Sequence, residues 1–419
     1  MALIKKGVTG MKDILPEEMI IRDYLINIIK KTYGSFGFTS IETPAMEHIE
    51  NLLSKQGGDN EKLIFKVLKR GEKLKLDDVK DENDLVDAGL RYDLTLPLAR
   101  YYSNNQANLP NPFKALQIGN VYRADRPQKG RFRQFTQCDI DILGETSNLA
   151  EIELILATTK ALSEIAKGKK FTVRINDRRI LLAMALFAGY SEDNISNVFI
   201  ILDKMDKIGL DGVRKELTEL DGADKCEKYL NLFDGLSNDS KALVSLKESL
   251  AGFIEEGVLD SLSDIMNTVL DVKENDFSLE FDPTLVRGMG YYTGTIFEVS
   301  MEGFSGSVAG GGRYDKMIGK FTGSDTPACG FSIGFERIIT ILMDSGFKIP
   351  DESKKIAFLY EKNIDASVLT SILKEASALR ADGNIVLVSK MNKNKKFQKE
   401  GLEKQGYVEF KEFYREALK

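Results

Sequence analysis

Residues 121–135 read VYRADRPQKGRFRQF, a stretch in which β-type sequence is interrupted by a dense run of charge. Its flanks predict two strands within residues 112–144. Pro127 and Gly130 argue against continued pairing, so the charged centre is predicted to be an exposed loop. A loop held between two strands is a frequent position for a ligand site.

The charge in this loop is mostly positive. Guanidinium groups bind phosphate oxygens through paired hydrogen bonds, so such a cluster suits a polyphosphate together with its metal ion. A solvated loop is the commoner explanation when a run of this kind occurs alone, and further signals are therefore needed. The cations are Arg123, Arg126, Lys129, Arg131 and Arg133, and they surround Asp125.

A second signal is LVRGMGYYTGTIFEV, residues 285–299. Arg287 is predicted on a strand, and Gly288 and Gly290 remove side-chain bulk beside it, as close approach of a ligand requires. Alternatively, the glycines mark only a bulge and the two tyrosines are ordinary strand aromatics. Neither alternative explains an arginine within an apolar strand.

A third signal combines SVAGGGRYD, residues 307–315, with PACGFSIGFERI, residues 327–338. The first is predicted to be a glycine-rich bend. The second is predicted to be a strand that ends at Gly334 and is followed by a helix beginning near Phe335. In the first turn of that helix, Arg337 could bind phosphate oxygens. Because neither a Walker nor a Rossmann glycine pattern is present, a phosphate site of another architecture is required.

The composition limits the chemistry further. With one histidine, His48, a Ser-His-Asp relay or a histidine-rich metal site is hard to assemble. The three cysteines form no CxxC pair, which argues against a structural metal. The net charge of −6 means that any nucleic-acid contact must come from local basic patches, and no apolar run has the length of a membrane span.

Outward from these motifs, the hydrophobic pattern predicts further elements. They are a helix over residues 17–33, a strand near 38–42 followed by an edge or interface residue, Pro44, a helix over 46–53 that contains His48, and a hairpin over 63–76 turned at Gly71.

Four segments are expected along the chain. Helical spacing after the expected N-cap Asp177 indicates a mostly helical insertion, and alternating strand and helix patterns near the C-terminus indicate a small α/β module. The segments are a first core part (1–175), the insertion (176–272), a second core part (273–345) and the module (351–419).

Taken in order, GFTSIETPAME (37–47), VYRADRPQKGRFRQF and GFSIGFERI (330–338) resemble the three signature motifs of class II aminoacyl-tRNA synthetases. Within that class, LVRGMGYYTG and SVAGGGRYD resemble the two histidine-specific signatures of the histidyl-tRNA synthetase family. LRYDLTLPLARYY (90–102) and QCDIDILG (137–144) resemble its substrate-binding strands. The similarity spans roughly residues 7–342, and Gly290 stands where the family usually has an acidic residue.

The resemblance implies an α+β fold: a six-stranded antiparallel sheet flanked by helices, with the active site on its open face. The helical insertion would clamp the tRNA acceptor stem. The C-terminal module resembles a shortened anticodon-binding domain, and the segment around Pro44 would lie at a homodimer interface.

The resemblance also implies the residues of an ATP site. Arg123 would contact the α-phosphate and the histidine carboxylate, whereas Arg131 and Arg337 would hold the β- and γ-phosphates. Asp125, in a position that is often Glu, and Glu336 would belong to the same site.

For the amino acid, the resemblance implies a pocket of acceptors. Asp93, Thr95 and Gln137 would hold the α-amino group, and Asp141 would line the imidazole pocket together with Tyr291 and Tyr292. Arg287 matches the catalytic arginine, which would neutralise charge opposite Arg123 as the substrate carboxylate attacks the α-phosphate.

The implied function is that of a cytoplasmic histidine–tRNA ligase, which uses ATP with Mg²⁺, L-histidine and tRNA(His), with no membrane partner. Arg126 and Gln128 would read the acceptor end. One alternative is the non-catalytic relative that regulates ATP phosphoribosyltransferase, and another is a plain tRNA- or protein-binding module on the same fold. The retained phosphate-binding arginines favour the enzyme.

Overall fold

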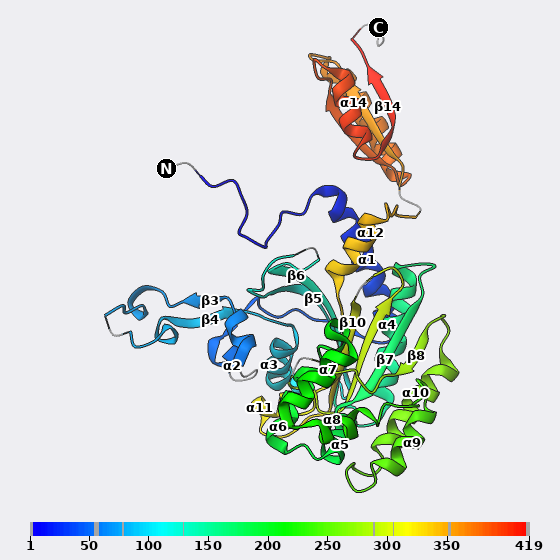
Figure 1. Ribbon diagram of the computed structural model, residues 1–419. Helices are drawn as coiled ribbons and strands as arrows, with labels where there is room; N and C mark the ends of the chain where they lie inside the picture. The colour runs from blue at the N-terminus through cyan, green and yellow to red at the C-terminus, as the bar shows by residue number, and fades with distance from the viewer. Residues whose placement is uncertain are drawn as a thin grey trace. The chain divides into compact units, whose positions relative to one another are not determined.

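A computed structural model describes residues 3–53, 58–77, 79–128, 130–287, 290–304, 306–350 and 353–415 (Figure 1). Lys129 and Gly288, both singled out above, lie outside the described residues. The chain divides into two compact units, one made of Met1–Ile14 with Arg22–Ser345 and the other of Leu15–Ile21 with Gly346–Lys419.

The first unit is built on a sheet in the order β1-β5-β6-β11-β10-β9-β7-β8. Its six inner strands, β5 to β7 in that order, are antiparallel throughout, as expected. The expectation of six strands was incomplete, because short strands β1 and β8 add a parallel pair at each edge. The strands are β1 (Thr39–Ser40), β5 (Phe113–Tyr122), β6 (Gln134–Leu143), β7 (Phe171–Asp177), β8 (Ser278–Phe281), β9 (Thr295–Met301), β10 (Ser307–Arg313) and β11 (Ala328–Ile333).

The central strand β6 shows how the sheet is oriented. Successive side chains of a strand point to opposite faces. Cys138, Ile140 and Ile142 are buried on one face, whereas Asp139 and Asp141 lie on the other. We call the second face, which bears the two aspartates, the site face.

Helices cover the face opposite the site face. On α1 (Pro16–Ser35), Leu25 and Ile29 are fully buried, and α4 (Leu149–Ile165) and α12 (Phe335–Asp344) pack against β6. A further pair, α3 (Thr95–Asn105) and α11 (Lys316–Thr322), pack against each other. Phe335 begins the helix predicted there.

A second, small sheet has the order β2-β4-β3, and β3 and β4 project from the main body in Figure 1. The predicted hairpin turned at Gly71 is wrong, because β3 (Lys66–Leu68) pairs with β4 (Val86–Leu90). A capping box at Asp81 starts a 3₁₀ turn directly before β4, and the polar sequence between the strands hid their pairing. The predicted helix over 46–53 is also partly wrong: Met46–His48 is strand β2, and only Ile49–Leu53 is helical (α2).

Six helices fill residues 178–272, all of which are described. The first follows Asp177, whose side chain accepts from the backbone N–H of Arg179, as expected for its N-cap. In Figure 1 the helices gather at one end of the first unit. They are α5 (Arg178–Ala188), α6 (Glu192–Leu202), α7 (Met205–Asp221), α8 (Ala223–Leu230), α9 (Lys241–Ser249) and α10 (Val258–Val272).

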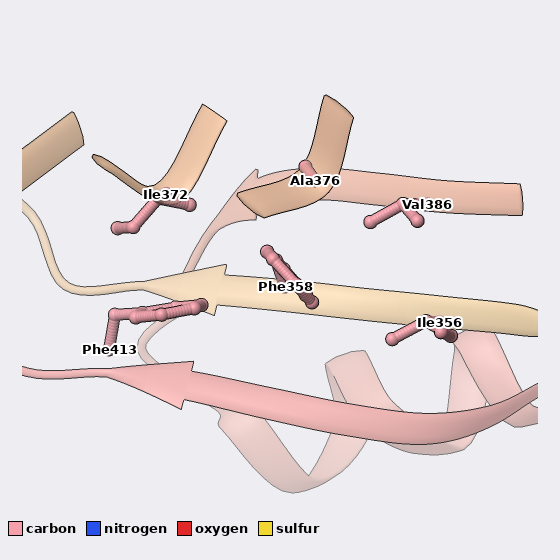
Figure 2. Close-up of a cluster of buried hydrophobic side chains, with 6 residues drawn as sticks. All are labelled: Ile356, Phe358, Ile372, Ala376, Val386 and Phe413. Carbon is pink, nitrogen blue, oxygen red and sulfur yellow. The ribbon is translucent and has the colours of Figure 1, made fainter. Parts of the chain in front are cut away.

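The second unit has a three-stranded parallel sheet in the order β13-β12-β14. Figure 2 shows its core, in which Ile356 and Phe358 of β12 face Ile372 and Ala376 of α13. The alternate residues of β12 pack with Leu402 of α14, so helices cover both faces of the sheet. The predicted order is confirmed: β12 (Lys355–Tyr360), α13 (Ala366–Ala381), β13 (Ile385–Lys390), α14 (Lys395–Glu403) and β14 (Tyr407–Phe413).

Among the helices of the described ranges, none combines the length and the apolar character needed to span a bilayer.

Candidate active site

A row of paired residues crosses the six inner strands on the site face. Each member lies directly opposite the next in the strand register, and such partners point to the same side of a sheet. The row runs Gln117, Asp139, Ser332, Gly310, Glu298, Arg174. A glycine at its centre leaves room above the sheet.

Two adjoining cavities open over this row. The larger, of about 270 Å³, we call the arginine cavity; Arg123, Asp125, Arg131, Arg287, Glu336 and Arg337 are among its lining residues. The smaller, of about 40 Å³, we call the tyrosine cavity; Thr95, Asp139, Asp141, Tyr291, Tyr292 and Tyr314 are among its lining residues. Arg287, Gly310 and Ser332 line both, so the cavities meet at Arg287.

Arginines from three distant parts of the sequence therefore converge. Arg123, Arg287 and Arg337 line the arginine cavity together with Arg131. Arginines remain cationic at neutral pH, and four of them around one space repel one another unless an anion is present. The arrangement can bind a multiply charged anion such as a polyphosphate.

Arg123 is held by aromatic rings. Its guanidinium lies 4.2 Å from the ring centroid of Tyr92 and 5.1 Å from that of Phe135. Its Nε also donates to the backbone oxygen of Tyr92 at 3.1 Å. Stacking of this kind fixes the plane of the guanidinium while leaving its charge in place.

The loop between β5 and β6 is closed by a short turn. Gln128 and Arg131 exchange backbone hydrogen bonds of 3.1 and 2.9 Å around Gly130, whose φ is 74°. Nε and Nη2 of Arg131 donate to Oδ2 of Asp125 at 3.1 and 2.9 Å. Arg126 and Gln128 are exposed on this loop and line neither cavity.

The carboxylate of Glu336 is bound by Arg22, a contact that no local pattern predicted. Both of its oxygens accept from Arg22 of α1, at 2.8 and 2.7 Å, and one also accepts the backbone N–H of Thr136 at 3.1 Å. The neighbouring Arg337 donates to the backbone oxygen and to Oγ of Ser307. Burial lowers the pKa of Arg337.

Arg287 does not lie on a strand, as predicted, but on an irregular segment between β8 and β9. Its Nη1 donates to Oε2 of Glu298 at 2.7 Å. The predicted glycine-rich bend is strand β10, and its glycines have a steric purpose: a Cβ on Gly310 would lie 2.5 Å from Nη1 of Arg287. The strand is bare there because the guanidinium lies against it.

The segment that leads to Arg287 is fixed to strand β7. The fully buried Asn176 donates from Nδ2 to the backbone oxygen of Leu285 at 3.2 Å. The N–H of Asp282 donates to the backbone oxygen of Ile175 at 3.0 Å, and Oδ1 of Asp282 accepts from the N–H and the hydroxyl of Thr284. Arg287 therefore follows directly after a segment that hydrogen bonds hold in place.

In the tyrosine cavity, Asp141 has one oxygen in use and one available. Oδ1 accepts from the hydroxyl of Tyr314 at 2.5 Å, whereas the buried Oδ2 has no partner among the described residues. Burial raises the pKa of Asp141 to about 7, the Tyr314 hydrogen bond opposes that rise, and the charge of Asp93 adds to it. A buried acceptor beside aromatic rings suits an N–H donor of a planar ligand.

Two more acceptors lie near Asp141: Asp93, whose charge raises the pKa of Asp141, and Gln137, which lines the arginine cavity. Oδ2 of Asp93 and Oε1 of Gln137 are buried, and neither has a partner in the part of the chain that is described. The other groups of both side chains are used: Oδ1 of Asp93 accepts the N–H of Leu96, and Nε2 of Gln137 donates to Oγ of Ser332 at 3.0 Å. Such acceptors suit a bound ammonium group.

Sequence reasoning missed four of the residues that build the site: Arg22, Asp139, Glu298 and Tyr314. Asp139 could have been found, because it alternates with Gln137 and Asp141 along β6. Burial raises its pKa well above the ordinary range, and the charge of Asp141 raises it further.

No group of three or more metal-ligating side chains occurs within the described residues. Asp125 and Glu336 are the carboxylates that line the arginine cavity. Because Arg22 binds both oxygens of Glu336, Asp125 is the better placed of the two to ligate an ion that arrives with a polyphosphate.

Comparison with known proteins identifies the family of the chain. The sequence model of the family described as histidyl-tRNA synthetase matches residues 10–338. The histidine–tRNA ligase of Leifsonia xyli subsp. xyli is 42% identical over 401 residues, which are 92% of this chain and 90% of that protein.

Solved structures give the same result. The crystal structure of histidyl-tRNA synthetase from Nostoc sp. PCC 7120 matches with a TM-score of 0.79 at 28% identity, covering 97% of this chain and 90% of that one. An ATP phosphoribosyltransferase regulatory subunit/histidyl-tRNA synthetase from Bacillus halodurans C shares the fold, with a TM-score of 0.74 at 21% identity and 99% of each chain covered. The chain belongs to the histidyl-tRNA synthetase family.

Proposed function

We propose that the protein is a histidine–tRNA ligase, which activates histidine with ATP and transfers the histidyl group to tRNA(His). The observation that carries the proposal is the meeting of the two cavities at Arg287, one lined by four arginines and Gln137 and the other by Asp141. The buried Oε1 of Gln137 and Oδ2 of Asp141 have no partner among the described residues. The arginine cavity suits a triphosphate, and the two acceptors suit a small molecule with two N–H donor groups.

ATP, as its Mg²⁺ complex, would occupy the arginine cavity. Arg123 would contact the α-phosphate, and Arg131 and Arg337 the β- and γ-phosphates. When ATP binds, Arg131 would give up part of its hydrogen bonding to Asp125 and bind phosphate oxygens instead. The loss is small because an exposed ion pair contributes little stability. The metal ion would be held mainly by phosphate oxygens with Asp125, and it would withdraw charge from them.

Histidine would occupy the tyrosine cavity. Its ammonium group would donate to Oδ2 of Asp93, to Oε1 of Gln137 and to the hydroxyl of Thr95. An imidazole N–H would donate to Oδ2 of Asp141, with Tyr291 and Tyr292 against the ring. An amino acid without that N–H would leave the buried acceptor unpaired, which costs far more than an imperfect fit in an apolar pocket.

In the first step, a carboxylate oxygen of histidine attacks the α-phosphorus, and pyrophosphate leaves with the electrons of the broken bond. The attacking carboxylate is already ionised at neutral pH, so no general base is required. Arg123 and Arg287, on opposite sides of the reacting phosphate, would hold the anions in line and stabilise the charge of the transition state. Catalysis would rest on position and charge.

In the second step, the 3′-terminal adenosine of tRNA(His) would accept the histidyl group and release AMP. The exposed Arg126 and Gln128 would contact the acceptor end, and residues 176–272 would form an insertion that clamps the acceptor stem. A homodimer formed around the exposed Pro44 and a cytoplasmic location, where tRNA is charged, complete the proposal.

Residues 351–419 would form an anticodon-binding-like module, and residues 1–175 and 273–345 would form the catalytic core. Helix α14 of the module carries the exposed Lys396 and the exposed ring of Phe397, a combination suited to RNA phosphates and bases. Removal of the residues after Pro350 should weaken tRNA(His) binding roughly tenfold or more and leave ATP binding unchanged, as measured by filter binding at fixed salt. Unchanged tRNA affinity would contradict a role for the module.

The regulatory-subunit alternative shares the fold, so fold alone does not separate the two functions. Purified protein tested for ATP–pyrophosphate exchange with a panel of amino acids should respond to histidine and to no other. Arg287→Ala should lower the rate by about 10³-fold, the order expected when one transition-state charge contact is lost. A folded wild-type protein that supports no exchange with any amino acid would favour the alternative.

A further inference from the structure

The carboxylate of Glu298 joins two arginines. Oε2 accepts from Nη1 of Arg287 at 2.7 Å, and Oε1 accepts from Nη2 of Arg174 at 2.5 Å. The Glu298 side chain is 15% exposed, that of Arg287 22% and that of Arg174 24%. Hydrogen bonds between ionised groups are short and strongly oriented when they are shielded from water.

The strand register explains why the bridge is rigid. Arg174, Glu298 and Gly310 are direct cross-strand neighbours on β7, β9 and β10. Arg287 belongs to the segment between β8 and β9, not to a strand of this row. Its guanidinium lies against the backbone of Gly310, where any Cβ would displace it. Its guanidinium is therefore confined from below by Gly310 and from one side by Glu298.

Arg174 holds the second oxygen of Glu298 and is paired with Asp282 and Asp206 as well. Because Oε1 is bound by Arg174, the single negative charge is shared between two guanidinium groups. Arg174 is itself held in place by Asp282 at 3.2 Å, on the turn that leads to Arg287. The same arginine thus fixes both the bridging carboxylate and the segment that carries Arg287.

The charges around Arg287 are consistent with this balance. Burial lowers the pKa of Arg287, and Tyr292 and Glu298 more than offset that effect, so the net change is upward. Arg287 stays cationic in a site that also contains Arg337 and Arg123. A guanidinium pushed away by other arginines needs a carboxylate behind it to stay in one place.

We propose that Glu298 is a positioning residue, which holds Arg287 over Gly310 for the activation step, with Arg174 as its second anchor; this rests on the proposed function. Glu298 acts only through Arg287 and touches no substrate. Loss of Glu298 should therefore lower the rate of the chemical step more than the affinity for either substrate.

The test is a double-mutant cycle in histidine-dependent ATP–pyrophosphate exchange. Glu298→Gln should lower kcat by roughly 10- to 100-fold, the usual loss when a positioning contact is removed, with KM for histidine and ATP changed by less than about threefold. In an Arg287→Ala background the same substitution should have no further effect, because the residue that it positions is gone. Glu298→Asp should recover part of the rate, and Arg174→Lys should give an intermediate loss.

The matched control is Glu153→Gln, which removes another half-buried ion-paired glutamate, on α4 beneath the opposite face, and should leave exchange unchanged. If the wild-type protein is active and Glu298→Gln either retains full kcat or lowers it equally in both backgrounds, the positioning role is wrong. If Glu298→Gln does not fold, Glu298→Asp is taken through the same cycle. An inactive wild-type protein would instead contradict the proposed function.

Discussion

The arginine cavity and the tyrosine cavity share a wall but are built by opposite means. In the arginine cavity the cations already have partners, such as Asp125 for Arg131 and Glu298 for Arg287, and the surplus of positive charge invites an anion. In the tyrosine cavity, the buried Oδ2 of Asp141 lacks a partner within the described residues, so the cavity favours a ligand with a hydrogen-bond donor. The arginine cavity therefore selects ligands by their negative charge, and the tyrosine cavity selects them by the hydrogen bonds that they can donate.

The two cavities should therefore contribute differently to selectivity. Positive charge attracts any polyphosphate, and positioning decides the rate there. An unpaired buried acceptor penalises every ligand that lacks the right donor, so identity is decided in the tyrosine cavity.

The largest effect is expected from Asp141→Asn. Tyr314 would keep the amide oxygen, so the amide N–H₂ would face the imidazole N–H, donor against donor. We expect kcat/KM for histidine to fall by roughly 10³-fold while KM for ATP changes little. Exchange kinetics with each substrate varied separately measures both, and a loss shared equally between histidine and ATP would contradict the division.

A smaller effect is expected from Gly310→Ala, which lies in the shared wall. The added Cβ would meet the Arg287 guanidinium at 2.5 Å and displace it, so kcat should fall about 30-fold. Gly34→Ala is the matched control, because nothing lies within 4 Å of its Cβ position and its φ is not positive. An unchanged kcat in Gly310→Ala would show that the position of Arg287 is not critical.

Next is the pH dependence of the tyrosine cavity. The pKa of Asp141 is raised by burial to about 7, so the ionised acceptor is lost as pH falls through 7. We expect kcat/KM for histidine to fall about fivefold between pH 7 and pH 6 beyond the loss due to protonation of free histidine, which occurs at a similar pH. In Asp141→Asn, the additional decrease in kcat/KM should disappear, and only the decrease caused by protonation of free histidine should remain. Identical profiles for the two proteins would argue against ionised Asp141.

The smallest effect is expected at Gly290, where the family usually has an acidic residue. A Cβ there would meet nothing within 4 Å, and the residue is exposed beside Tyr291, outside the linings of both cavities. Gly290→Asp should change the exchange rate by less than about threefold, in the range of surface substitutions. A large gain would mean that this position takes part in catalysis.

Local sequence patterns predicted those parts of the fold that depend on residues close together in the sequence. The charged run from Arg123 to Arg133 marked the loop between two strands, and helix α12 begins at the predicted Phe335. The convergence of Arg123, Arg287 and Arg337 was expected from the order of the motifs, which the resemblance supplied.

Contacts between distant residues could not be predicted in this way. The pair of Arg22 and Glu336 spans 314 positions, and the opposition of Gly310 to Glu298 depends on a strand register that no local pattern contains. Arg287 was predicted on a strand, yet Leu285 and Val286 before it are both buried, whereas Tyr291 and Tyr292 after it line the tyrosine cavity. Burial therefore does not alternate as it would along a half-buried strand. The glycines of β10 were taken for a bend for a similar reason: sequence shows a missing side chain but not what lies against it.

The most direct measurement is a crystal structure of the protein with a non-hydrolysable histidyl-adenylate analogue. We expect the imidazole to donate to Oδ2 of Asp141 and the phosphate-like group to lie between Arg123 and Arg287. An analogue bound with its adenylate end in the tyrosine cavity, or with the two arginines on the same side of the phosphate position, would contradict this expectation.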